Sequence, residues 1–113
     1  MKLNIQEKYG AVVISIDGNI MGGPDEVQFY EKLQELIKEN KKNVVVDLGN
    51  VEWINSRGLG MLISGLTTMK NSGGKMKLAR VVNKVESLLA MTKLISVFEN
   101  YDTVDEAVKS FSQ

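Results

Sequence analysis

The sequence predicts an α/β fold with a mixed β-sheet of about five strands and about four helices, and three observations lead to it. Some segments are short apolar runs, which are typical of strands. Others have apolar residues spaced three and four apart, which is typical of helices, and the two kinds of segment alternate along the chain. The expected order is β-β-α-β-α-β-α-β-α, in which the opening pair is antiparallel and the later strands need parallel crossovers. A chain of 113 residues with 43% hydrophobic content is expected to form one domain, residues 1–113.

Two strands open the chain and a helix follows them. Apolar and polar residues alternate over 3–7, and after a short turn an apolar run covers 11–16. Pro24 suits the first position of a helix, because its missing N–H would have no partner there. The helix is expected to end near residues 38–40, and an apolar stripe predicts its buried face: Phe29, Leu33, Leu36 and Ile37.

The next strand and helix form the centre of the predicted fold. Residues 43–48 contain three consecutive valines, which favour a strand covered on both faces. Asp47, near the end of that strand, is expected to hydrogen-bond the following loop. The next helix is expected to close at residues 71–74, and its apolar face has helical spacing: Leu59, Leu62, Ile63, Leu66 and Met69.

Asn55 or Ser56 is expected to be the N-cap of that helix, since either side chain can accept from unpaired backbone N–H groups. Gly58 and Gly60 lie in the first turns, where glycine costs helix stability. They predict either close packing against the sheet or close approach by a partner. Ser56 is therefore expected to present its hydroxyl at the positive end of a helix dipole, where a phosphate would meet N–H donors.

The last third of the sequence predicts two further strands and two further helices. Residues 75–79 read as a strand with a wetter face that carries lysines, and residues 94–98 read as the last strand. Asn83 with a glutamate three residues later resembles a capping box for a short helix, and Thr103 begins a second such pattern.

The composition excludes several classes of function. Fourteen basic residues balance fourteen acidic ones, so direct nucleic-acid binding is not expected. No apolar run is long enough to cross a bilayer and no signal peptide is recognisable, which favours a cytoplasmic protein without membrane insertion. Without cysteine or histidine, the chain offers no thiol nucleophile, no histidine base and no ordinary zinc site, so an enzyme is not expected.

The run DLGNVEWINSRGLGMLI resembles the signature of STAS domains, in particular the bacterial anti-sigma factor antagonists. Their pattern is an apolar strand, an Asp-Leu or Asn-Leu pair, a variable bridge, then D-S-S/T-G-L-G and an apolar helix. The length and the order of the elements also agree, so the resemblance covers essentially the whole chain. It implies a STAS-type sheet with helices.

The resemblance also implies a function. Ser56 aligns with the serine that the family uses as phosphoacceptor. The unphosphorylated chain would bind an anti-sigma factor serine kinase and release a sigma factor, and a PP2C-type serine phosphatase would reset the switch. ATP and metal would belong to these partners, so no cofactor is expected on this chain. The residues expected to contact a partner lie in two loops and the helix start: Met21, Asp25, Trp53, Asn55, Ser56, Arg57, Gly58 and Leu59.

Two positions depart from the family pattern. Asn55 stands where an acidic residue usually precedes the acceptor, and it keeps hydrogen-bonding capacity. Arg57 stands where serine or threonine is common, and it either pairs with a phosphate or an acidic partner or is an ordinary solvated side chain. In the loop before the first helix, where the family tends to carry an acidic residue, this chain has Met21, and Asp25 lies slightly further on.

Several alternatives remain open at this level. Ser56 could act as a helix cap alone, and Trp53 could be a packing anchor for the loop or an interface contact. The whole chain could be a STAS scaffold that is not phosphorylated, a docking subunit of a larger assembly such as a lipid transporter or stress complex. An enzyme with Ser56 as nucleophile is disfavoured, because no histidine can activate the hydroxyl.

Overall fold

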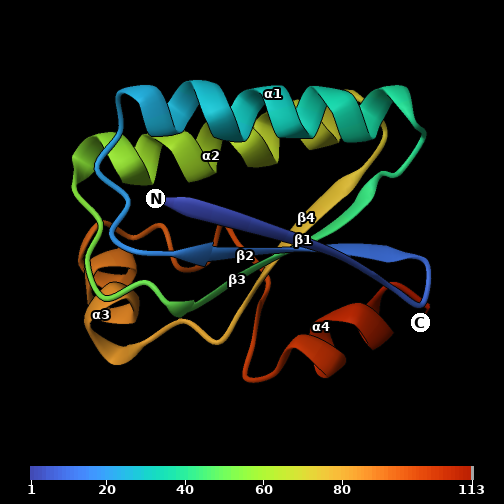
Figure 1. The fold of residues 1–113 in the computed structure, drawn as a ribbon. Helices are drawn as coiled ribbons and strands as arrows, with labels where there is room; N and C mark the ends of the chain where they lie inside the picture. The colour runs from blue at the N-terminus through green and yellow to red at the C-terminus, as the bar shows by residue number, and fades with distance from the viewer. Residues whose placement is uncertain (113) are drawn as a thin grey trace.

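The computed structural model, which describes residues 1–112, contains a five-stranded sheet in the order β1-β2-β3-β4-β5 (Figure 1). Strand β1 (Lys2–Lys8) pairs antiparallel with β2 (Ala11–Asp17). Strands β3 (Asn43–Asn50), β4 (Lys75–Ala79) and β5 (Asn100–Tyr101) continue the sheet in parallel. The predicted mixed sheet of five strands with four helices is therefore confirmed.

The helices lie on both faces of this sheet. Figure 1 shows α1 (Pro24–Lys38) and α2 (Ser56–Asn71) side by side over one face, with α4 (Val104–Ser110) on the opposite face. Helix α3 (Asn83–Met91) adds two side chains to the core beneath α1 and α2. The sheet is thus enclosed between two unequal helical layers, as expected for strands that need parallel crossovers.

The valines of β3 explain why this strand is buried on both sides. Val44 and Val46 belong to the larger core, which the sheet shares with α1 and α2. Val45 points to the other face and belongs to a smaller core with Ala107 and Val108 of α4. Successive side chains of a strand point to opposite faces, so a continuous apolar run needs cover on both.

The prediction that the lysines of β4 lie on a solvent-exposed face is wrong for Lys77. Only 4% of this residue is exposed, because α4 covers it. Its Nζ donates to Ser110 Oγ over 2.7 Å and lies 4.4 Å from the ring centroid of Phe111. The long apolar stem of lysine packs beneath the helix while its ammonium finds polar and aromatic partners.

A surface ion pair also links α4 to the edge strand. The ammonium of Lys8 on β1 bonds the carboxylate of Asp105 in the first turn of α4. This hydrogen bond and the positive charge of Lys8 hold the pKa of the Asp105 carboxyl below its ordinary value. The pair is exposed to solvent, and its contribution to the stability of the domain is therefore small.

Two predictions for the last third of the chain are wrong. Residues 94–98 form turns, and the last strand is the short β5 instead. The N–H groups of Leu94 and Ile95 both donate to the Leu89 carbonyl, so they close the end of α3 rather than join the sheet. The predicted capping box at Asn83 is also absent, because Val82 is the N-cap of α3 without a side-chain bond. Thr103 does cap α4, as predicted.

Candidate functional site

Ser56 is the first residue of α2 and is exposed to solvent. A loop leads to it from the carboxyl end of β3, at the end of the sheet where ligands of parallel α/β sheets commonly bind. Figure 1 shows this loop beside the loop that joins β2 to α1. The predicted acceptor position is therefore on the surface, at the start of a helix.

Backbone hydrogen bonds join these two loops into one unit. The N–H of Ile20 donates to the Trp53 carbonyl over 3.1 Å, and the N–H of Asn55 donates to the Ile20 carbonyl over 3.2 Å. Ile20 and Ile54 form a parallel bridge, and both side chains are buried. The position of Ser56 thus depends on a segment more than 30 residues away in sequence.

Asn55, and not Ser56, is the N-cap of α2. Its Oδ1 accepts from the N–H of Gly58 over 2.8 Å, and its Nδ2 donates to the Met21 carbonyl over 2.9 Å. A carboxylate could make the first bond but could not donate the second. Within residues 1–112, no hydrogen bond to the Ser56 hydroxyl is present, so this hydroxyl is left for a reaction or a partner.

Asn55→Ala is expected to destabilise the domain by about 1.5 kcal/mol, because it removes the cap and the bond to the Met21 carbonyl. Asn55→Asp should cost less, since it retains the cap and loses only the second bond. Urea unfolding followed by circular dichroism would measure both variants. Asn55→Ala with the stability of wild type would contradict the role assigned to this amide.

The two glycines at the start of α2 have different surroundings. A Cβ added at Gly58 would lie 2.2 Å from the Ile20 carbonyl oxygen, whereas a Cβ at Gly60 would meet nothing within 4 Å. Gly58 therefore lets the helix start pack tightly against the β2–α1 loop. Gly60 faces open space on the surface of the helical layer.

The electrostatic surroundings of Ser56 favour an anion. The first turn of α2 carries no acidic residue, whereas Glu86 lies in the first turn of α3 and acidic pairs occupy those of α1 and α4. Arg57 adds a cation whose side chain is 70% exposed, and its Nε lies 3.4 Å from Glu26 Oε1. Unpaired N–H groups and the helix dipole add further positive potential at this end.

The remaining predicted contact residues divide into exposed and supporting ones. Met21 and Trp53 are 46% and 50% exposed, so about half of each residue is open to solvent. Asp25 is partly exposed, with its Oδ1 3.8 Å from the amino nitrogen of Met1. Gly58 and Leu59 are buried, and they support the exposed residues from below.

Sequence reasoning missed three residues that shape this site: Ile20, Gly22 and Glu26. Gly22 has a φ of +85°, and a Cβ there would lie 2.6 Å from the Arg57 Cβ. Glycine tolerates this backbone conformation and this close approach. The glycines of the loop were the only local signal, because the contacts join segments far apart in the chain.

Asp47 has a structural role, as predicted. It accepts from the N–H of Gly49 over 3.0 Å, from Ser15 Oγ over 3.2 Å and from Arg80 Nε over 2.8 Å. Across residues 1–112, no three acidic side chains gather as metal ligands would. Among these residues, none of the helices combines the length and the apolar character that crossing a bilayer requires.

Comparison with known proteins gives a consistent result. The model of the STAS domain family matches residues 2–107. A protein of Thermotoga maritima, named provisionally as an anti-sigma factor antagonist, is 32% identical over 75 residues, which cover 66% of each chain. The anti-sigma F factor antagonist of Paenibacillus polymyxa is 20% identical over 102 residues, or 90% of this chain and 87% of that protein.

Solved structures share the fold at low sequence identity. The crystal structure of a provisionally named anti-sigma factor antagonist from Thermotoga maritima superposes with a TM-score of 0.84 at 23% identity, over 98% of this chain and 95% of that one. The phosphorylated form of the Bacillus cell fate determinant SpoIIAA has a TM-score of 0.74 at 14% identity, over 97% and 99% of the two chains. These likenesses establish the fold alone.

Proposed function

The chain belongs to the STAS domain family, and on that premise we propose that it is an anti-sigma factor antagonist switched by phosphorylation of Ser56. In its unphosphorylated form it binds an anti-sigma factor serine kinase, which then releases a sigma factor in the cytoplasm. The kinase transfers the γ-phosphate of ATP to Ser56, and a PP2C-type phosphatase removes it. The chain itself carries out no catalysis.

The observation that carries this proposal is the state of the Ser56 hydroxyl. Ser56 is exposed at the first position of α2, and Asn55 already caps the helix through its bond to Gly58. A kinase can therefore modify Ser56 without breaking a hydrogen bond that holds the fold. The names of two relatives, both anti-sigma factor antagonists, support the same assignment.

The fold should tolerate the added phosphate. A phosphoserine carries about −1.5 to −2 charges at neutral pH, and the N-terminus of a helix favours negative charge. The first turn of α2 has no carboxylate that would repel the phosphate. Arg57 is the next residue in the sequence, so its side chain can exchange its ion pair with Glu26 for one with the phosphate. The domain should thus remain folded while its surface changes.

A partner packed against this surface would not tolerate the phosphate. Met21 and Trp53 expose large apolar side chains on the two loops that position Ser56, and such side chains are common anchors of protein interfaces. An interface formed over them would have to desolvate a doubly charged group. Phosphorylation therefore acts as a local change of charge that removes the partner.

Intact-mass spectrometry after incubation with ATP and extract of the native host tests the proposal. We expect wild type to gain one phosphate and Ser56→Ala to gain none. A known kinase substrate labelled in the same extract serves as the control. If neither protein is labelled while that substrate is, the phosphorylation switch is excluded.

A specific observation favours a second candidate, a STAS scaffold that is never phosphorylated. The amide of Asn55 and the ion pair of Arg57 with Glu26 give the loop two contacts within the chain itself. A docking subunit of a larger assembly needs such a preformed loop but no modification. The mass measurement separates the two candidates.

A further inference from the structure

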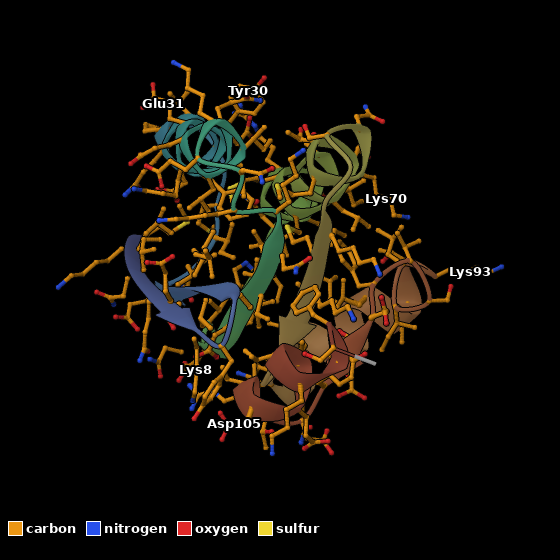
Figure 2. All side chains as sticks on the ribbon, turned by 90° about the vertical axis from the view of Figure 1, so that its right-hand side faces the viewer. Lys8, Tyr30, Glu31, Lys70, Lys93 and Asp105 are labelled. Carbon is orange, nitrogen blue, oxygen red and sulfur yellow. The ribbon has the colours of Figure 1, made fainter. Side chains whose placement is uncertain are left out.

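An apolar groove runs between α1 and α2 on the surface of the helical layer. The groove encloses about 720 Å³, and its floor includes Phe29, Leu33 and Met61. Val27 and Tyr30 line its α1 side and are 58% and 52% exposed. Figure 2 views both helices nearly end-on and shows Tyr30 on the outward side of α1, away from the sheet.

Small residues on α2 make the groove deep. Gly60 and Ser64 lie four residues apart on the exposed surface of α2, and a Cβ at Gly60 would meet nothing within 4 Å. At Gly65 a Cβ would lie 2.7 Å from Phe29 Cε2, so this glycine allows α1 and α2 to pack closely beneath the groove. The backbone of another helix could approach α2 closely along Gly60 and Ser64.

The edge of the groove is acidic. Glu26 and Glu31 line it from α1, and Arg57 lines it from α2. Arg57 is already paired with Glu26, whereas Glu31 has no ion-pair partner within residues 1–112. The uncompensated charge at the groove is therefore negative, and an occupant with cationic groups beside an apolar face would complement it.

The groove between the helices is about two turns long. It follows α2 from Arg57 to Gly65, a rise of about 12 Å. A second hollow of about 330 Å³ shares Tyr30 and Glu31 with it, but its other lining residues are polar and lie on α1 alone, so it is not part of the groove. An amphipathic helix of about two to three turns matches the length of the groove.

We propose that the groove between α1 and α2 docks an amphipathic helix of a protein partner, with lysine or arginine beside its apolar face. The groove ends at Arg57, next to Ser56, so the helix belongs to the partner that contacts the Ser56 loop, and in this the inference rests on the proposed function. The partner's helix contributes binding affinity by packing along α1 and α2, while phosphorylation of Ser56 in the adjacent loop decides whether the partner can bind.

Two model peptides test the groove without the natural partner. Both are 14-residue amphipathic helices with the same leucine face, one flanked by lysines and the other by glutamates. In NMR titrations of the uniformly ¹⁵N-labelled protein, the lysine peptide should shift amides of Val27, Tyr30, Gly60 and Ser64, and it should bind at least about tenfold more tightly than the glutamate peptide, a difference of about 1.4 kcal/mol. Glu31→Lys should reduce or reverse this preference.

Gly60→Leu fills the groove and should weaken the lysine peptide at least about tenfold. Thr67→Leu, which places the same side chain at an exposed position of α2 outside the groove, is the matched control. Circular dichroism checks that both variants are folded. Equal binding of the two peptides by wild type, or full binding by folded Gly60→Leu, would overturn the proposal.

Two other occupants would also overturn it. Amide shifts at the same residues with dodecanoate but with neither peptide would indicate an acyl ligand. A dimer in sedimentation equilibrium that Gly60→Leu abolishes would indicate a second copy of the chain. The peptide assay uses unmodified protein, so a negative result there would not contradict phosphorylation of Ser56. Conversely, absence of phosphate on Ser56 in the mass measurement would not contradict peptide binding in the groove.

Discussion

Ser56→Asp is expected to bind the partner kinase at least about 30-fold more weakly than wild type, which corresponds to about 2 kcal/mol of lost binding free energy. The added carboxylate would have to be desolvated in the interface without a partner charge. The fold should be unaffected or slightly stabilised, since a carboxylate in the first turn of α2 interacts favourably with the helix dipole. Ser56→Ala should keep the fold, because the wild-type hydroxyl makes no hydrogen bond within residues 1–112, and it should retain affinity because it adds no charge to the interface.

Isothermal titration calorimetry with the purified kinase would measure these affinities. Ser112→Asp, which places the same charge on an exposed serine after α4, is the control for a general effect of charge. It should bind like wild type. Equal affinities for wild type, Ser56→Ala and Ser56→Asp would remove the switch mechanism, whatever the phosphorylation assay shows.

Gly58→Ala and Gly60→Ala are expected to change stability in opposite directions. At Gly58 the new methyl would meet the Ile20 carbonyl oxygen at 2.2 Å, so the helix start and the β2–α1 loop must separate. This overpacking should cost about 2 kcal/mol net of the better helix propensity of alanine, and should lower Tm by about 8 °C. At Gly60 the methyl meets nothing, and alanine should stabilise the helix by about 0.5–1 kcal/mol.

Thermal and urea unfolding of the two variants would measure this difference directly. Each variant adds the same methyl group, two residues apart on the same helix, so propensity is matched and only the surroundings differ. Similar stability changes for both would mean that the contact between Gly58 and Ile20 is looser than described. Gly58→Ala should also weaken partner binding, because it displaces the loop that positions Ser56.

The sequence by itself determined most of the fold and the place of Ser56 at the start of a helix. Hydrophobic periodicity placed β1 to β4 and α1 to α4, because each buries one face or one stripe and so records its own geometry in the spacing of apolar residues. The signal was weakest after α3. There Leu94, Ile95 and Phe98 are apolar because they pack on the main core from turns rather than from a strand, and the two-residue β5 is too short for a period to be visible.

Only the tertiary structure decided how the site is built. Local sequence allowed either Asn55 or Ser56 to cap α2. The Met21 carbonyl, held nearby by the Ile20 bridge, favours Asn55, because its amide donates to that carbonyl through Nδ2 while its Oδ1 accepts from the Gly58 N–H. The sequence likewise could not tell that Gly58 packs against the Ile20 carbonyl while Gly60 faces open space. Such contacts join segments distant in sequence, and their geometry depends on how the sheet brings loops together, which no local pattern of residues records.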